Sequence, residues 1–168
     1  MKPKTRGMTK KDLEDVNRIQ NLRYPFGNDI FLIPRPYERT VKDYEKQAMD
    51  ENTFPLVVEI KGKVVGYSTI FVLRGRSRHM GFVNFSIDPK HIKRTAKPLI
   101  QATIDVGKRL NLVKLFTEIL DESDELRKLV EEFGFKAETR RRKTAFFERR
   151  FVDCIGMGLM LKEIPQIA

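Results

Sequence analysis

The sequence has few of the side chains that form disulfides and metal centres. It contains one cysteine, two histidines and no tryptophan in 168 residues. A single cysteine excludes an intramolecular disulfide, and one thiol with two imidazoles provides too few ligands for a structural zinc site. The cysteine, Cys154, lies in the apolar run "DCIGMGLML", which indicates a packed thiol rather than a nucleophile. We therefore expect a protein that binds no metal.

Long apolar segments are also absent. No run approaches the roughly 20 residues that a membrane-spanning helix needs. The N-terminal segment "MKPKTRGMTKKD" is basic, but no apolar stretch follows it as in a signal peptide. These features predict a cytoplasmic protein with no membrane partner. Acidic residues are the minority, because 23 Asp and Glu stand against 33 Lys and Arg, and the net charge of +10 favours phosphate-bearing partners.

The predicted helices and strands alternate along the chain. Residues 9–24 and 40–51 each open with a Thr-x-x-Asp pair, which is a loose capping box, and residues 25–36 between them contain enough proline and glycine to predict a loop. The remaining predictions are strands at 55–73 (with a tight turn at Lys61 and Gly62), 80–87, 112–120, 136–144 and 153–161, helices at about 96–110 and at 123–133, and a loop at 145–151. This order predicts an α+β fold (a three-layer α/β arrangement) in a single domain, residues 1–168, with a mixed, mostly antiparallel sheet flanked by helices.

Short motifs in the second half of the chain point to a known family. The strand at 80–87 leads into Ile87-Asp88-Pro89, and the later segment "TEILDESDELRKLVEEFGF" contains a strand, a helix and a glycine stop. With the element order, which covers nearly the whole chain, these motifs resemble the GNAT family of acetyl-CoA-dependent N-acetyltransferases. The resemblance implies acetyl-CoA as co-substrate and a primary amine of a protein, peptide or small metabolite as acceptor.

The resemblance places the CoA diphosphate where the helix near residue 96 begins. The family motif Q/R-x-x-G-x-G/A falls on "HIKRTA", so Ala96 fits, but Arg94 stands where the first glycine is expected. Backbone amides would then surround the phosphates less closely, and cationic side chains would compensate. The alternative is a solvated turn in a basic chain. The residues assigned to this phosphate site are Lys93, Arg94, Thr95, Ala96 and Lys97.

Direct transfer of an acetyl group to an amine needs no protein nucleophile. It needs a held amine, an acceptor for the amine proton and a donor to the thioester oxygen. The resemblance assigns the pantetheine arm and the oxygen donor to the backbone of Phe85, Ser86 and Ile87. It assigns proton acceptance to Glu118, and Asn84 is expected to line the acceptor site; both are alternatively ordinary polar strand residues.

Two further positions depart from the family pattern. Val130 stands where a tyrosine often protonates the departing thiolate, and Ser123 replaces an asparagine that often lies near the cofactor. Ser123 is assigned to the cofactor site, with a helix N-cap as the alternative. Because of Val130 and Arg94, the alternative function is a degenerate GNAT-like module that binds acyl-CoA, nucleic acid or another anionic partner without turnover.

The last hairpin is strongly basic. Residues 140–143 read "RRRK" and residues 148–150 read "ERR". This charge favours an acidic acceptor, or it protects an exposed strand edge from aggregation. Nucleic-acid binding would use Phe146 and Phe147 as stacking rings, but "AFFERRF" matches no known nucleic-acid motif, so that partner is not favoured. A monomer and a homodimer both remain open.

Overall fold

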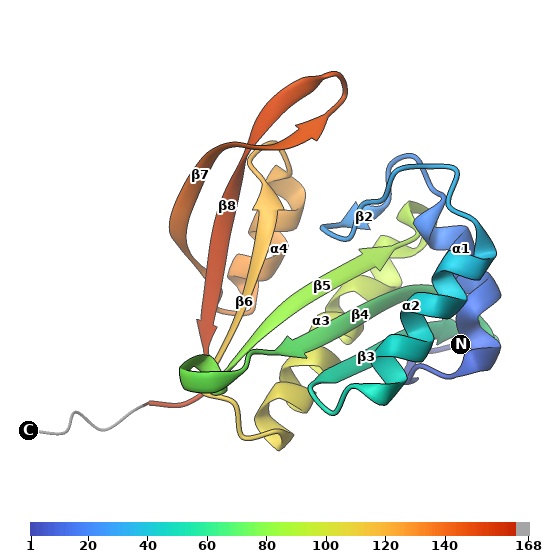
Figure 1. The fold of residues 1–168 in the computed structure, drawn as a ribbon, viewed down its shortest axis with the longest axis horizontal. Coiled ribbons are helices and arrows are strands. Elements are labelled where there is room, and N and C mark those ends of the chain that lie inside the picture. The colour runs from blue at the N-terminus through green and yellow to red at the C-terminus, as the bar shows by residue number, and fades with distance from the viewer. Residues whose placement is uncertain (164–168) are drawn as a thin grey trace, which may run out of the picture. The chain divides into compact units, whose positions relative to one another are not determined.

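The computed structural model describes residues 1–163, which contain eight strands and four helices (Figure 1). The strands are β1 (Lys4–Gly7), β2 (Phe26–Gly27), β3 (Thr53–Ile60), β4 (Lys63–Val72), β5 (Met80–Ile87), β6 (Lys114–Leu120), β7 (Lys136–Phe147) and β8 (Arg150–Met160). The helices are α1 (Leu13–Gln20), α2 (Tyr37–Met49), α3 (Ile92–Arg109) and α4 (Asp124–Glu132). None of these helices has both the length and the apolar character needed to span a bilayer.

The strands form one mixed sheet in the order β1-β3-β4-β5-β6-β8-β7, and β2 pairs separately with β5. The β5–β6 pair is parallel, whereas β1–β3, β2–β5, β3–β4, β6–β8 and β7–β8 are antiparallel. This topology confirms the predicted α+β class. The chain divides into two compact units, one of Met1–Phe71 with Asn84–Thr103, the other of Val72–Val83 with the chain from Ile104 onward.

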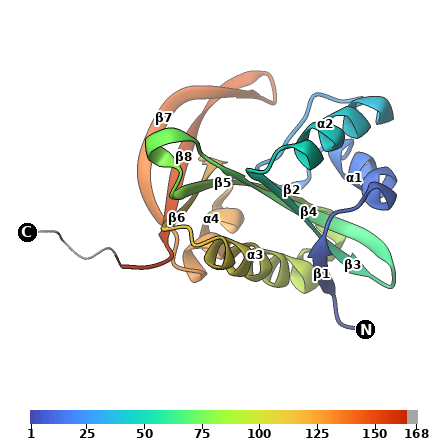
Figure 2. The same cartoon turned by 60° about the horizontal axis from the view of Figure 1, so that its bottom comes forward.

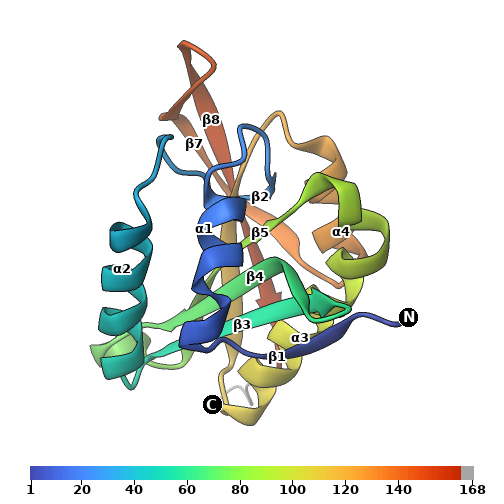
Figure 3. The same ribbon diagram turned by 90° about the vertical axis from the view of Figure 1, so that its right-hand side faces the viewer.

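In the first unit, α1 and α2 cover one face of β3 and β4, and α3 begins on the opposite face (Figures 2 and 3). Val16 and Ile19 of α1 pack against Val57, Val64 and Tyr67 of the two strands. Each of these five side chains is at most 3% exposed. Burial of an aliphatic side chain contributes about 1.5–3 kcal/mol, so this contact fixes α1 on the sheet. The apolar spacing of residues 13–22 therefore predicts the buried face correctly.

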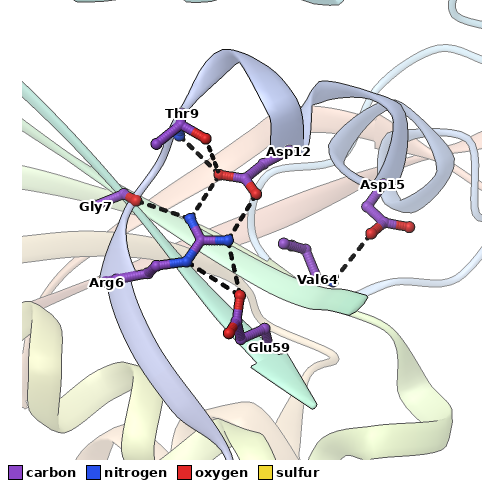
Figure 4. A network of polar contacts seen from close by, with 7 residues as sticks. All are labelled: Arg6, Gly7, Thr9, Asp12, Asp15, Glu59 and Val64. Atoms are coloured by element: carbon purple, nitrogen blue, oxygen red, sulfur yellow. Dashed lines mark hydrogen bonds and ion pairs between the residues drawn. The ribbon is translucent and has the colours of Figure 1, made fainter. Parts of the chain in front are cut away.

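A guanidinium links β1, the start of α1 and β3 (Figure 4). Arg6 donates to both carboxylate oxygens of Asp12 at 2.8 Å and to Glu59 at 2.7 and 3.1 Å. Asp12 also accepts the backbone N–H of Thr9 at 2.7 Å, which is the reciprocal half of the predicted capping box. The N-terminal strand is thereby tied to the sheet by charged hydrogen bonds as well as by backbone pairing.

In the second unit, α4 lies between β6 and β7 in the chain and ends as predicted. Gly134 has φ +95°, and the N–H of Phe135 bonds the carbonyl of Val130 at 3.2 Å. This is the glycine stop expected after an α-helix, and Phe135 behind it is buried. Cys154 on β8 is 7% exposed, and burial raises the pKa of its thiol, so the prediction of a packed thiol is confirmed.

Two predicted helix starts are wrong. The second helix begins at Tyr37 rather than at residue 40, because Pro36 takes the N-cap position. Thr40, predicted as a cap, is instead buried and donates to Gln20 at 2.6 Å. The third helix begins at Ile92 rather than near residue 96. Asp88 starts the chain turning earlier, because its carboxylate accepts the N–H of Lys90 at 3.1 Å.

The last hairpin is also longer than predicted. The predicted loop at 145–151 is mostly strand, since β7 runs to Phe147 and β8 starts at Arg150. Only Glu148 and Arg149 form the turn, and both have positive φ. Two short strands have no predicted residue range: β1 is the first strand of the expected element order but its residues were not assigned, and β2 lies in the segment predicted as a loop. Both are short, and pairing with a long strand is what orders them.

Candidate functional site

The first unit contains a cavity of about 230 Å³. Strands β4 and β5, helices α1 and α2, and the segment joining these helices provide its walls. The apolar lining residues are Met8, Leu13, Val16, Phe31 and Phe71. The polar lining residues are Gln20, Asp29, Thr40, Asp43, Tyr44, Gln47, Tyr67, Thr69 and Asn84. In a chain with a net charge of +10, the lining contributed by residues 1–163 has two carboxylates and no lysine or arginine.

Asp29 and Tyr67 form a close pair on the cavity wall. The Tyr67 hydroxyl donates to Asp29 Oδ2 at 2.6 Å. Burial raises the pKa of Asp29 above its usual value, although the hydrogen bond from Tyr67 and the charge of Arg35 act in the opposite direction. Burial also raises the pKa of Tyr67, and the neighbouring carboxylate adds to the effect. Tyr67 therefore remains a hydroxyl donor at physiological pH, fixed against the carboxyl group.

The second carboxylate of the cavity has a cationic partner. Asp43 of α2 is ion-paired with Arg35, and Arg35 Nε donates to Gln20 Oε1 at 3.1 Å. The Arg35 guanidinium also lies over the ring of Phe31, 4.1 Å from its centroid. Arg35 is thus held outside the lining and neutralises Asp43.

The segment after α1 is attached to the end of β5. The N–H groups of Asn28 and Asp29 donate to the carbonyl of Phe85 at 3.0 and 3.2 Å, and the N–H of Phe85 donates to Asn28 Oδ1 at 2.8 Å. In addition, Phe26 and Gly27 pair with Ile87 and Ser86. The strand backbone expected to hold the pantetheine arm is therefore hydrogen-bonded to β2 in this structure. Of the predicted residues here, Asn84 lines the cavity, whereas Phe85, Ser86 and Ile87 are buried.

The start of α3 carries exposed cationic side chains, but its backbone lacks the positive φ of a glycine-rich phosphate loop. Lys93, Arg94 and Lys97 are exposed, and the Arg94 guanidinium donates to the carbonyl of Met1. Thr95 is buried, and its hydroxyl donates to the carbonyl of His91 at 2.8 Å, so its side chain is already used within the helix. Ala96 is buried. Positive φ values in the described chain fall at other positions, so residue 94 has the right-handed backbone that an arginine favours.

The other predicted site residues belong to the second unit. Glu118 on β6 is ion-paired with Arg141 of β7. Ser123 occupies the N-cap position of α4, but its side chain makes no capping hydrogen bond. Val130 is buried on α4. Within residues 1–163, no group of three or more histidine, cysteine and acidic side chains could hold a metal ion.

Some of the basic side chains of the last hairpin are paired with acidic side chains of their own unit. Arg140 donates to Asp153 at 3.0 Å and to Asp121 at 2.6 Å, and Arg150 donates to Glu122 at 2.6 Å. These contacts neutralise part of the positive charge of the hairpin. The rings of Phe146 and Phe151 lie edge to face at 5.2 Å, and each is 66% exposed.

Sequence reasoning missed the pair at the cavity wall. Asp29 lies in a segment that reads as a proline-interrupted loop, and Tyr67 lies in a run that reads as a buried strand. Neither position has a spacing that would connect them, because they are 38 residues apart. The one local signal is "GND", a glycine followed by two residues that tolerate tight turns, which marks a fixed bend but not its partner.

Comparisons with known proteins agree with this architecture. The model of the acetyltransferase (GNAT) family matches residues 14–135, and no curated protein matches the chain. Among solved structures, an N-acetyltransferase from Staphylococcus aureus Mu50 is 19% identical, with a TM-score of 0.83 over 96% of this chain and 100% of that one. The ribosomal-protein-S18-alanine N-acetyltransferase from Escherichia coli is 17% identical, with a TM-score of 0.77 over 98% and 97%. A spermidine N-acetyltransferase from Vibrio cholerae, in complex with CoA and spermine, is 22% identical, with a TM-score of 0.81 over 95% and 96%.

Proposed function

This chain belongs to the acetyltransferase (GNAT) family, and on that premise we propose that it transfers an acetyl group from acetyl-CoA to a primary amine by direct attack. The observation that carries the proposal is the position of Asp29. Its side chain lines the cavity, and its backbone N–H bonds the carbonyl of Phe85. A small polar cavity therefore adjoins the part of β5 expected to hold the thioester.

Acetyl-CoA, when bound, supplies the activated acetyl group. The nitrogen–carbon bond forms as the carbon–sulfur bond breaks, the amine gives up a proton, and the thiolate takes one up. Asn84 lines the cavity and is proposed to orient the amine. Glu118, which is ion-paired with Arg141 of β7, is proposed to accept the amine proton.

The start of α3 fits a diphosphate through its side chains. The helix is 18 residues long, and its N-terminal amides and dipole favour an anion. Lys93 and Arg94 are exposed there. The ammonium group of Lys93 provides a compact positive charge, and the planar guanidinium of Arg94 can donate to two phosphate oxygens at once. Thr95 and Ala96 are buried, and because α3 begins at Ile92 the helix itself uses their N–H groups, so the free amides at this end belong to the residues before them. Lys97 is exposed one turn after Lys93. The assignment of Ser123 to the cofactor site stays a prediction.

The pantetheine arm requires a change at β5. In the structure β2 pairs with Ser86 and Ile87, whose backbone groups the arm would use, whereas Asn28 and Asp29, which follow β2, bond the backbone of Phe85. β2 has only two residues, so few hydrogen bonds would be lost if it withdrew. Only the pairing of β2 would be exchanged, and the bonds of Asn28 and Asp29 to Phe85, which fix Asp29, would remain. We propose this exchange as the way the co-substrate reaches β5.

Substitution of Arg94 by glutamate tests the phosphate site. We expect acetyl-CoA affinity, measured by calorimetry, to fall about 10- to 100-fold, because a charge-assisted hydrogen bond contributes about 1.5–3 kcal/mol. Lys42→Glu is the matched control, since Lys42 is exposed on α2 and the change in net charge is the same. Equal affinity in the Arg94→Glu variant and the wild type would remove the phosphate site from α3.

Measurement of thiol release from acetyl-CoA with a panel of amines distinguishes the transferase from a module that binds acyl-CoA without turnover. Acetyl-CoA-dependent thiol release that requires an amine supports the transferase. Tight acetyl-CoA binding with no release for any amine supports the module without turnover. A thermal shift with RNA that disappears at high salt would indicate nucleic-acid binding instead, since phosphate contacts weaken steeply with ionic strength.

A further inference from the structure

We infer that the cavity in the first unit selects an acceptor amine that carries a second positive group, and that Asp29 binds this second group. The inference rests on the proposed transferase function and adds to it a substrate class. The nitrogen that attacks a thioester must first lose its proton and is therefore uncharged. A carboxylate that contributes to binding in the reactive complex needs a cation that persists, and a second ammonium provides one.

The charge of the lining supports a cationic acceptor. Of the described residues that line this cavity, two are carboxylates and none is basic, although the chain as a whole carries a net charge of +10. An acceptor with its own carboxylate would meet like charges at short range, where burial strengthens the repulsion. The basic hairpin, whose charge favours acidic partners, belongs to the other unit, and Arg140, Arg141 and Arg150 in it are paired with acidic side chains.

Asp29 rather than Asp43 is the carboxylate suited to this role. Asp43 is neutralised by its ion pair with Arg35. The Asp29 side chain instead accepts a hydrogen bond from an uncharged hydroxyl, that of Tyr67. An ionised carboxylate can accept several hydrogen bonds, so the contact with Tyr67 leaves capacity for an ammonium group. The charge of a bound ammonium would favour the ionised form of Asp29, which burial alone disfavours.

The position of Asp29 is fixed before any ligand arrives. Its own N–H and that of Asn28 bond the carbonyl of Phe85, and the Tyr67 hydroxyl orients the carboxyl group. Tyr67 is 2% exposed and packs in the core with Val16 and Ile19. A carboxylate held in this way loses little side-chain entropy on binding, which raises the affinity for a cation.

The size and chemistry of the walls suit a slender aliphatic amine. A volume of about 230 Å³ lies below the range of about 300–1,000 Å³ that drug-sized ligands occupy. Phe31, Tyr44 and Phe71 add aromatic surface, which binds alkyl chains and attracts ammonium groups. A short linear diamine or the end of a longer polyamine meets these requirements.

Three acceptors of equal chain length test the inference: 1,4-diaminobutane, butylamine and 4-aminobutanoate. Acetyl-CoA-dependent thiol release should give a kcat/KM for the diamine about 10- to 100-fold above that for butylamine, since one charge-assisted contact contributes about 1.5–3 kcal/mol. The amino acid should be the poorest acceptor. Equal values for the three, or a preference for 4-aminobutanoate, would overturn the inference.

The Asp29→Asn variant tests whether Asp29 is the residue that selects the diamine over butylamine. We expect the ratio of diamine to butylamine kcat/KM to fall toward one. Glu45→Gln, an equal charge change on an exposed position of α2, should keep the wild-type ratio. If Asp29→Asn folds poorly, Tyr67→Phe provides a second variant, because it removes the hydroxyl that orients Asp29 and should lower the ratio severalfold. An unchanged ratio in a folded Asp29 or Tyr67 variant would contradict the assignment.

Calorimetry with 1,4-diaminobutane, with and without CoA, distinguishes a failure of the proposed transferase function from a failure of the inferred cation site. If no amine is acetylated but the wild type binds the diamine more tightly than butylamine, the transferase function fails and the cation site stands. If amines are acetylated but the diamine binds no better than butylamine, the function stands and the inference fails.

Discussion

Alanine at position 27 is expected to detach β2 from β5. Gly27 has φ +150°, and a Cβ at this position would lie 2.0 Å from the carbonyl oxygen of Phe85. The neighbouring contacts are also backbone atoms, so no side-chain rotation relieves the overlap. We expect Gly27→Ala to lower the free energy of unfolding by about 2 kcal/mol, within the range for overpacked sites. Urea unfolding measures this loss, and hydrogen exchange at the Phe85 amide should become at least tenfold faster.

Gly27→Ala should affect acetyl-CoA and a diamine acceptor in opposite directions. Release of β2 exposes the backbone of Ser86 and Ile87, so acetyl-CoA should bind more tightly. Asp29 loses its anchorage at the same time, so kcat/KM for a diamine should fall. Gly7→Ala is the matched control, because a Cβ there meets no atom within 4 Å. Weaker acetyl-CoA binding in Gly27→Ala would show that β2 supports the co-substrate site rather than covering it.

Removal of the Asp12 carboxylate is expected to be the most destabilising change at the N-terminal strand. The Asp12 side chain is 6% exposed and binds Arg6, which then keeps only Glu59 as an acidic partner. Truncation of one member of a buried charge pair costs about 3–5 kcal/mol, and partial exposure of Arg6 places Asp12→Ala near the lower end. Urea unfolding at neutral pH measures the difference.

The pH dependence of this effect has a definite sign. Burial alone would raise the pKa of Asp12, but hydrogen bonds from Arg6 and Thr9 outweigh it and lower the pKa below its usual value. The stabilisation is therefore present above the unfolded pKa of about 4 and is lost as the pH falls through the lower folded value. The gap between wild type and Asp12→Asn should close in acid.

An exposed ion pair provides the control for Asp12. Arg127 and Glu131 on α4 are one turn apart, and their side chains are 40% and 44% exposed. Such pairs contribute about 0.3–0.5 kcal/mol. Glu131→Ala should therefore change stability little at any pH. A loss at Asp12 as small as that at Glu131 would contradict the structural role of the Arg6 network.

The local pattern of the sequence was sufficient for most elements. The apolar spacing in residues 13–22 predicts the buried face of α1, and Lys61 and Gly62 both adopt the positive φ that a tight hairpin turn requires. Gly134 and Phe135 end α4 as expected. These features depend on residues within one or two turns of each other, so the necessary information is contiguous in the chain.

The errors in the predicted helix starts and strands have a common cause. Thr40 carries the signature of a helix cap, yet it is buried against Gln20, which is 20 residues away. β2 is ordered only by its pairing with β5, about 60 residues further along the chain, so its two residues show no strand pattern. In each case a contact with a distant segment overrides the local preference, and no local pattern reports such a contact.

The sequence by itself determined the fold class, the family resemblance and the cationic start of α3, because these follow from periodicity, motif order and charge within short segments. Only the tertiary structure placed Asp29 against Tyr67, assembled an acid-lined cavity in a basic chain and paired β2 with Ser86 and Ile87. The physical reason is that a binding site is formed by side chains brought together through packing, and their proximity is a property of the folded chain.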